Sequence, residues 1–152
     1  MIAVILSVLL AQVSTPSPTP APGVPPGWTA QPLDPNEVFS FSRAEKDGTT
    51  SYLKVFRQLC DCQPGSYIDE VQTAITNQGA STKRDSLTVC GEPALRLIGT
   101  GIASEVKRNI ETIAFRSGKA FVSMNYFFAE NTPDPEAEAA LRSLCPPVSP
   151  AS

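Results

Sequence analysis

Four cysteines are the residues with the clearest potential for chemistry in this 152-residue chain, which contains no histidine. Cys60 and Cys62 are separated by one residue, whereas Cys90 and Cys145 stand alone further along the sequence. An even number of cysteines is typical of exported domains that form disulfides. The absence of histidine excludes Ser-His-Asp and Cys-His catalysis, zinc sites that use histidine, and a histidine pH switch.

We expect all four cysteines to form disulfides. A bond within Cys60-Asp61-Cys62 would close a strained small ring, so Cys60 and Cys62 are expected to bond to Cys90 and Cys145, in either combination. Two alternatives are a redox pair at Cys60 and Cys62 and a zinc site built from all four thiolates. Both alternatives require reduced thiols to survive in an oxidising compartment.

Carboxylates are the other groups that could act without histidine, because paired acids suffice for glycoside hydrolysis. The candidates are Glu92, Glu105 and Glu111, of which Glu111 falls on a predicted strand and could enter a cleft. Acidic side chains are more commonly exposed surface groups. We therefore assign no catalytic, cofactor-binding or metal-binding residue, and the sequence favours a protein that is not an enzyme.

A long hairpin forms the centre of the predicted fold. Residues 105–128 read EVKRNIETIAFRSGKAFVSMNYFF, in which residues alternate between two faces and the turn lies at Ser117-Gly118-Lys119. A second hairpin is predicted from VFSFS at 38–42 and SYLKVFRQL at 51–59. Residues 86–89 and 94–98 are predicted to form a further strand or strand pair.

Two helices are predicted to cover this sheet. The first has Ser66 as its N-cap, a stripe of apolar residues that includes Ile68, and Gly79 as its C-cap. The second has Asp134 as its N-cap and Pro135 at its first position. The apolar stripes predict burial of Val55, Ile75, Ile113 and Leu141, and Trp28 is expected to plug the core at the domain edge.

The first residues resemble an export signal. Residues 2–13 are almost wholly apolar, too short to span a bilayer, and a cleavage site follows Ala11. The region before the apolar run has no Lys or Arg, which leaves an uncleaved anchor or a wrongly assigned start as alternatives. We assign residues 1–13 to a signal peptide, 14–27 to a Pro/Thr/Ser-rich linker, 28–146 to one domain, and 147–152 to a disordered tail.

Charge and location limit the classes of partner. The net charge is −3 and the basic residues form no stripe, which argues against nucleic acid. An exported chain would be secreted or periplasmic, with no stable membrane span once its signal is removed.

The order of elements resembles the PsbP-like superfamily, which includes the Mog-type Ran-binding proteins and many small exported bacterial domains. The resemblance rests on CGEPALRL at 90–97, and on a Gly-Lys turn followed by an aromatic strand and an Asp/Pro-capped helix. It implies an α+β fold, an antiparallel β-sheet with helices packed on its faces in a PsbP-like α/β/α sandwich. Members mostly bind or assemble with other proteins, but their partner surfaces provide no motif to transfer to this chain. The cysteines are not a hallmark of the superfamily and indicate an exported branch.

The expected function is therefore that of an exported, non-enzymatic binding or accessory domain that engages an envelope or extracellular protein. One alternative is a small-ligand carrier that uses a concavity under Tyr126 and Phe128. The other is the carboxylate-based hydrolase. A pocket that holds a carboxylate of raised pKa would favour the enzyme, an apolar pocket the carrier, and a flat face with exposed aromatics the binding domain.

Overall fold

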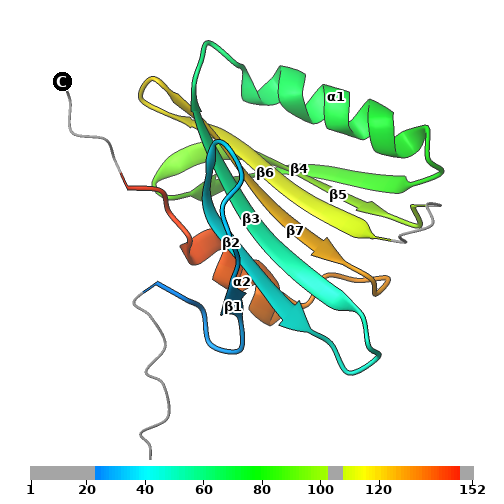
Figure 1. The fold of residues 1–152 in the computed structure, drawn as a ribbon. Coiled ribbons are helices and arrows are strands. Elements are labelled where there is room, and N and C mark those ends of the chain that lie inside the picture. Colours follow the sequence, from blue (N-terminus) through cyan, green and yellow to red (C-terminus); the bar gives the residue numbers. More distant parts are fainter. Residues whose placement is uncertain (1–22, 103–107, 148–152) are drawn as a thin grey trace, which may run out of the picture.

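The computed structural model describes residues 23–102 and 108–147, which form one antiparallel sheet with a helix on each side (Figure 1). The sheet has seven strands in the order β1-β2-β3-β7-β6-β5-β4. The strands are β1 (Thr29–Ala30), β2 (Glu37–Ala44), β3 (Thr50–Leu59), β4 (Ser81–Val89), β5 (Glu92–Thr100), β6 (Asn109–Ser117) and β7 (Ala120–Phe128). The helices are α1 (Pro64–Thr76) and α2 (Pro135–Ser143).

The central hairpin is confirmed. Strands β6 and β7 pair in register from Asn109 with Phe128 to Ser117 with Ala120, and Gly118 in the turn has a φ of 59°. Positive φ values favour glycine, which explains why the chain reverses here. The β2–β3 hairpin and the β4–β5 strand pair are also present, and both are longer than predicted.

The predicted α+β class, with its α/β/α sandwich, is wrong, because the described chain is a mostly β fold with only two short helices. Strands account for 47% and helices for 18% of the described residues. Two features of the strands explain why the sequence indicates less β-structure than the chain forms. The edge strand β4 begins at Ser81 and not at Ser86, and its first half is polar, so it lacks the apolar alternation that marks a half-buried strand. The strand β1 has only two residues.

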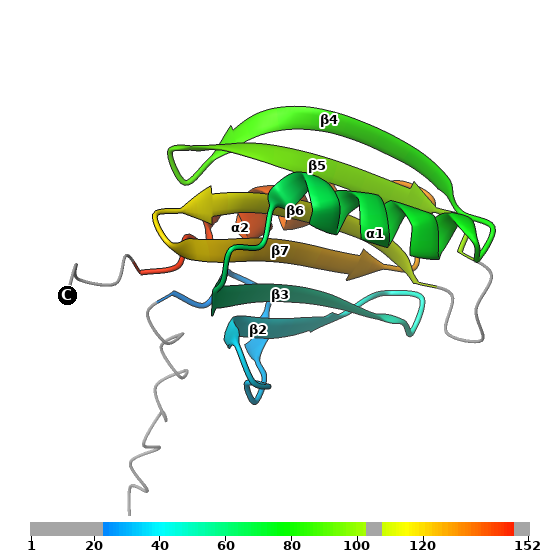
Figure 2. The same ribbon diagram turned by 90° about the horizontal axis from the view of Figure 1, so that it is seen from above.

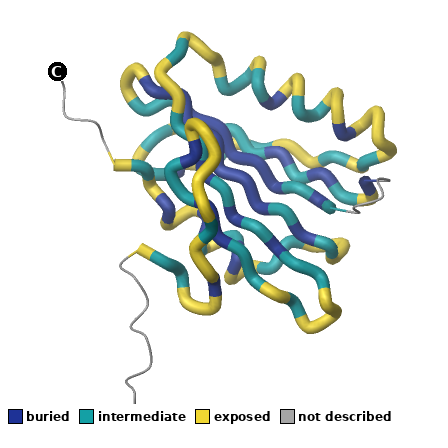
Figure 3. Tube along the Cα trace, viewed as in Figure 1, coloured by how far each residue is buried: buried dark blue, intermediate teal, exposed yellow. Residues whose placement is uncertain are grey.

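Each face of the sheet has its own hydrophobic cluster. We call the cluster under α2 the α2-side core; its buried residues are Trp28, Phe41, Leu53, Val55, Val89, Ala94, Ile113, Phe115, Val122, Met124, Tyr126, Phe128, Ala137, Leu141 and Leu144. The α1-side core consists of Ile68, Ile75, Leu97, Ile102, Ala114 and Phe121. The predicted burial of Val55, Ile75, Ile113, Leu141 and Trp28 is confirmed. Figure 3 shows that burial is concentrated in the middle strands.

Helix α1 begins earlier than predicted, with Gln63 and not Ser66 at its N-cap, and the Gln63 side chain makes no capping hydrogen bond. Pro64 occupies the first helical position, where a missing N–H costs nothing. The helix lies close to β5 because Gly99 has no side chain. A Cβ there would come within 2.3 Å of Ile75 Cδ1.

The predicted cap of α2 is confirmed. Asp134 accepts a hydrogen bond from the backbone N–H of Glu136 at 3.0 Å, and Pro135 is the first helical residue. The Asp134 carboxylate also accepts a hydrogen bond from Arg43 at 2.8 Å. The contact ties the start of α2 to β2.

The predicted signal peptide and most of the predicted linker and tail lie outside the described residues. Within residues 23–102 and 108–147, neither helix is long and apolar enough to cross a membrane.

Candidate functional site

An open groove lies beside α1 because this helix covers only one side of its sheet face. The helix contacts β4, β5 and β6, and Figure 2 shows β2 and β3 lying to one side of it. The resulting cavity, here called the α1 groove, has a volume of about 610 Å³. Its lining residues come from α1, the segments before α1 and β2, and strands β3 and β7: Pro35, Asn36, Phe56, Gln58, Cys62, Gln63, Ser66, Tyr67, Glu70, Phe121 and Ser123.

The floor of the α1 groove combines aromatic rings with buried polar groups. The rings of Tyr67 and Phe121 meet edge to face with centroids 5.2 Å apart. The Tyr67 hydroxyl lies 3.4 Å from both Thr112 Oγ1 and Asn125 Oδ1, and Thr112 donates to Asn125 at 2.8 Å. Asn125 Nδ2 donates to Ser123 Oγ at 3.4 Å. The groove therefore offers apolar surface next to groups that can exchange hydrogen bonds.

An ion pair fixes the rim of the groove near β2. Lys54 Nζ donates to Glu37 Oε1 at 3.0 Å, and the other Glu37 oxygen accepts from the backbone N–H of Asp34 at 3.0 Å. Glu37 stands at a register shift between β2 and β3. These contacts hold the segment that carries Pro35 and Asn36 against the sheet.

The cysteines form two disulfides, but the predicted pairing is wrong: Cys60 bonds to Cys62, and Cys90 bonds to Cys145. Cys60 packs against the α1-side core, whereas Cys90 packs against the α2-side core. The sheet separates Cys60 from Cys90 and from Cys145, which is bonded to Cys90. Cys60 therefore cannot form either of its predicted cross-links. For the same reason the four thiolates do not converge on a zinc site.

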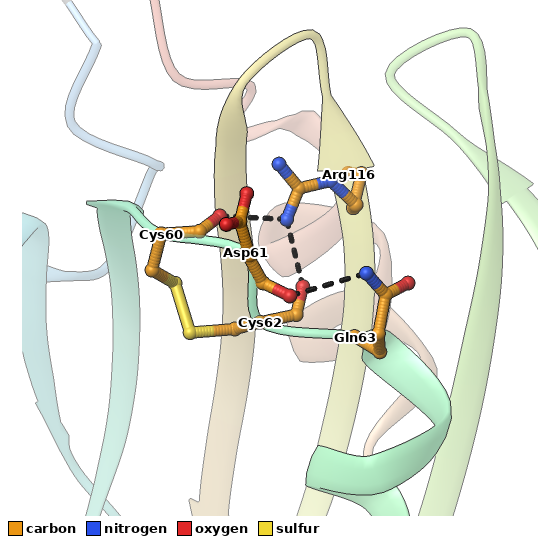
Figure 4. Close-up of a disulfide and its surroundings, with 5 residues drawn as sticks. All are labelled: Cys60, Asp61, Cys62, Gln63 and Arg116. Atoms are coloured by element: carbon orange, nitrogen blue, oxygen red, sulfur yellow. Dashed lines mark hydrogen bonds between the residues drawn. A yellow bond between two sulfur atoms is a disulfide. The ribbon is translucent and has the colours of Figure 1, made fainter.

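The short disulfide closes a loop at residues 60–62, which leads from β3 into α1. Arg116 donates hydrogen bonds to the carbonyl oxygens of Cys60 at 2.8 Å and Cys62 at 2.7 Å (Figure 4). Gln63 Nε2 donates to the carbonyl oxygen of Asp61 at 3.1 Å. The bond can form because the backbone turns at Asp61 and brings the two Cα atoms to 5.2 Å, within the usual disulfide range.

The two cross-links constrain very different lengths of chain. The Cys90–Cys145 bond spans 55 residues, which corresponds to about 4 kcal/mol of stabilisation in the chain-entropy model. The Cys60–Cys62 bond spans a separation of 2, which corresponds to about 1.5 kcal/mol. The longer bond is therefore the one that stabilises the fold, by attaching the end of α2 to the β4–β5 turn.

Glu111, a hydrolase candidate, lies on the α2 side of β6 and is fully buried. Neither of its carboxylate oxygens has a hydrogen-bond partner among the described residues, although Arg96 Nη1 lies 3.7 Å away. Arg96 is also held by Asp85 and lies 3.5 Å from Glu138. Burial, and then the neighbouring Glu138 carboxylate, raise the pKa of Glu111 from 4.5 to about 7.

Two of the three hydrolase candidates, Glu92 and Glu111, do not come together. Glu111 pairs with Ile98 of β5, and Glu92 lies six residues before Ile98, which places the two acids about 20 Å apart along the strand. Glycosidase carboxyl groups are about 5–10 Å apart. Glu105 lies outside the described residues. The acid that does approach Glu111 is Glu138, which was not among the candidates.

The α1 groove is not the concavity under Tyr126 and Phe128 that the small-ligand hypothesis invoked. Tyr126 and Phe128 are buried in the α2-side core, and their rings stack with centroids 4.8 Å apart. The α1 groove lies on the other face and was not predicted. Its one detectable signal was Phe56, an aromatic residue on the polar face of a predicted strand.

No family model matches this sequence, and no curated protein matches it. Among solved structures, the chain is similar to LpqN, described as involved in cell envelope biogenesis of Mycobacterium tuberculosis. The two chains are 15% identical, with a TM-score of 0.49, over 80% of this chain and 74% of LpqN. The resemblance to the PsbP-like superfamily is not confirmed by these comparisons.

Proposed function

We propose that this chain is an exported, non-enzymatic binding domain that receives an extended segment of an envelope or extracellular protein in the α1 groove. The observation that carries the proposal is the incomplete cover of the sheet by α1, which leaves aromatic and hydrogen-bonding groups in one open cavity. The two disulfides support a location in an oxidising compartment.

The lining favours a polypeptide occupant. Phe56, Tyr67 and Phe121 offer apolar contacts, whereas Asn36, Gln58, Gln63 and Ser66 offer amides and a hydroxyl that suit a peptide backbone. Leu33, whose large apolar side chain is exposed, lies two positions before the lining residue Pro35. Exposed apolar side chains near a groove are typical of protein-binding surfaces.

A site-specific cross-link tests the proposal. A photo-cross-linking amino acid replaces Ser66, an exposed residue of α1 that lines the groove, and a control variant carries it at Ala74, exposed on α1 outside the groove. The protein is expressed in its native host and irradiated. We expect a polypeptide adduct at position 66 and none at position 74. Adducts of equal yield at both positions, or none at 66, would refute the groove as the site.

Two alanine variants sharpen this test. Phe56→Ala removes an aromatic wall of the groove, whereas Phe39→Ala removes an equally half-buried ring that packs against the α2-side core. We expect Phe56→Ala to abolish the adduct at position 66 and Phe39→Ala to preserve it. Loss of the adduct in both variants would indicate a general loss of structure and not a groove contact.

A small-ligand carrier is the second candidate, because a volume of about 610 Å³ also lies in the range of small-molecule sites. The same experiment separates the two. A cross-linked adduct of a few hundred daltons, in place of a polypeptide, would favour the carrier.

A further inference from the structure

We propose that the Cys60–Cys62 disulfide is a thiol–disulfide exchange site, and that its substrate is a cysteine-bearing segment of an exported polypeptide bound in the α1 groove. The position of the substrate rests on the proposed function. The reactivity of the disulfide rests on the surroundings of the loop itself.

Cys62 is exposed and lines the α1 groove, whereas Cys60 is half-buried against the α1-side core. A thiolate in the groove can therefore reach the Cys62 sulfur directly. Substrate side chains on either side of that thiolate would lie near Phe56 and Phe121, which line the same groove.

Cys62 immediately precedes the N-cap of α1, a 13-residue helix whose first N–H groups receive no side-chain cap from Gln63. The positive end of a helix stabilises a thiolate, as does a nearby guanidinium. Arg116 supplies that guanidinium, and its hydrogen bonds to both cysteine carbonyls keep it beside the loop (Figure 4). We therefore expect the helix start and this guanidinium to favour the thiolate form of a reduced Cys62.

The Cys60–Cys62 bond contributes little to the stability of the fold. It links residues that are two positions apart, at the surface, in a loop already fixed by Arg116 and Gln63. The fold is cross-linked by the other disulfide, which joins segments 55 residues apart. Opening the Cys60–Cys62 bond therefore leaves the rest of the domain in place.

A substrate thiolate attacks the Cys62 sulfur, the bond between Cys60 and Cys62 breaks, and Cys60 leaves as a thiolate that takes up a proton. A second substrate cysteine then attacks the substrate sulfur of this mixed disulfide and releases Cys62. The substrate gains a disulfide and loses two electrons and two protons, which the two cysteines of this chain accept.

Selective reduction is the first test. The full-length oxidised protein is incubated with a reduced synthetic peptide that has two cysteines flanked by leucine and phenylalanine, then alkylated and mapped without reduction. We expect the Cys60–Cys62 bond to open at least about tenfold faster than the Cys90–Cys145 bond. Equal rates, or faster opening of Cys90–Cys145, would overturn the proposal.

Thiol titration in the Cys60→Ser variant is the second test, because a loop with only a structural role would not shift the pKa of Cys62. Alkylation rates measured against pH should give Cys62 a pKa below the usual value of about 8.5. We expect Arg116→Gln to raise this pKa, whereas Lys119→Gln, which removes a charge from the turn of the same hairpin, leaves it unchanged. An ordinary pKa for Cys62 that neither variant shifts would contradict the electrostatic argument.

A change of peptide separates this inference from the proposed function. A second peptide replaces the leucine and phenylalanine by serine. Faster exchange with the apolar peptide, lost in Phe56→Ala, supports both conclusions. Rapid and selective exchange with both peptides would support the proposal of a reactive disulfide and would refute the groove as the substrate site. Failure of selective exchange refutes the disulfide proposal and leaves the groove to be judged by cross-linking.

Discussion

At the scale of single residues, Glu111 is the described charged group whose burial is least compensated by hydrogen bonds. It is a carboxylate with no exposure, and its two oxygens have no hydrogen-bond partner in the described part of the chain. Protonation would relieve the cost of burial and would let Glu111 donate a hydrogen bond towards the Glu138 carboxylate. This residue should therefore link the stability of the fold to pH.

The sign of this link follows from the raised pKa. The folded protein holds the Glu111 proton up to about pH 7, whereas the unfolded chain releases it near 4.5, so this residue favours the folded state at low pH. Its contribution is complete below pH 4.5 and is lost as the pH rises through 7. The difference between these two pKa values corresponds to about 3 kcal/mol in the free energy of unfolding.

Glu111→Gln should remove this dependence. We expect denaturant titrations at several pH values to show that the wild type loses stability relative to this variant between pH 4.5 and 7. Glu92→Gln, a partly exposed acid on the neighbouring strand, is the control and should follow the wild type. A constant difference between wild type and Glu111→Gln across the range would contradict the assignment.

Ile113 provides a second prediction at this scale. Its side chain is fully buried in the α2-side core. Ile113→Ala should lower the free energy of unfolding by about 2–5 kcal/mol, since it removes apolar contacts and leaves a cavity. A loss below about 0.5 kcal/mol, the usual range for surface changes, would show that the site is not part of the core.

Individual core residues were predictable because alternation along a strand fixes which side chains share a face. Val55 and Ile113 follow from this rule alone. The burial of Glu111 did not follow, although it belongs to the same face as Ile113, since nothing in the sequence shows that α2 brings Glu138 and Arg142 over that face. Arg142 lies 3.3 Å from Glu138 and completes the charged cluster.

At the scale of elements, α2 depends on its two ends. Asp134 caps its start and pairs with Arg43, and the Cys90–Cys145 bond attaches the chain just beyond its last residue. The helix has only nine residues, too few to be stable alone. Its stability therefore comes from these attachments and from burial of Ala137 and Leu141.

Removal of each disulfide should affect stability unequally. Cys90→Ser with Cys145→Ser should cost about 4 kcal/mol, whereas Cys60→Ser with Cys62→Ser should cost about 1.5 kcal/mol. Thermal and denaturant unfolding of the two double variants provide the comparison. Equal losses would show that the short loop has a structural role that its length does not suggest.

The helix cap gives a smaller, local effect. Asp134→Ala should lower the stability by about 1 kcal/mol, because the N–H of Glu136 loses its acceptor. Asp134→Asn keeps that acceptor and removes the charge that pairs with Arg43. We expect the asparagine variant to lie between the wild type and the alanine variant in chemical denaturation, and an asparagine variant no more stable than alanine would place the whole effect in the ion pair.

The elements were largely predictable, but their pairing across the sheet was not. Both hairpins and the cap of α2 follow from local signals, namely alternation, a glycine turn and an Asp-Pro helix start. The disulfide pairing depends on which face each cysteine occupies, and that depends on the strand order. Cys60 and Cys90 end on opposite faces, so a rule based on spacing along the chain could not pair them correctly.

At the scale of the whole molecule, one helix that covers half of a sheet face determines where a partner can bind. The α1 groove exists because α1 packs over β4, β5 and β6 and leaves part of β3 and β7 beside it uncovered. Phe56 was the one local sequence signal, and it could not locate the groove because the lining comes from segments spread between Pro35 and Ser123.

Export is the prediction that concerns the chain as a whole. We propose that the mature protein begins just after Ala11, and N-terminal sequencing of material from the native host tests this. The expected result is a start at Gln12 in a fraction outside the cytoplasm. An intact Met1 in a cytosolic fraction would contradict the proposal.

The order of the strands has one more consequence, which concerns behaviour at high concentration. The sheet is not closed, and it ends at the two-residue β1 on one side and at the nine-residue β4 on the other. A free strand edge is a template on which a second chain can add its own strand. Here β1 offers only two residues to such a strand, whereas β4 offers nine, with three consecutive charged residues, Lys83, Arg84 and Asp85, in its first half. Charged side chains on an edge strand disfavour the addition of another strand, so the first half of β4 protects the chain against fibril-like association at this edge.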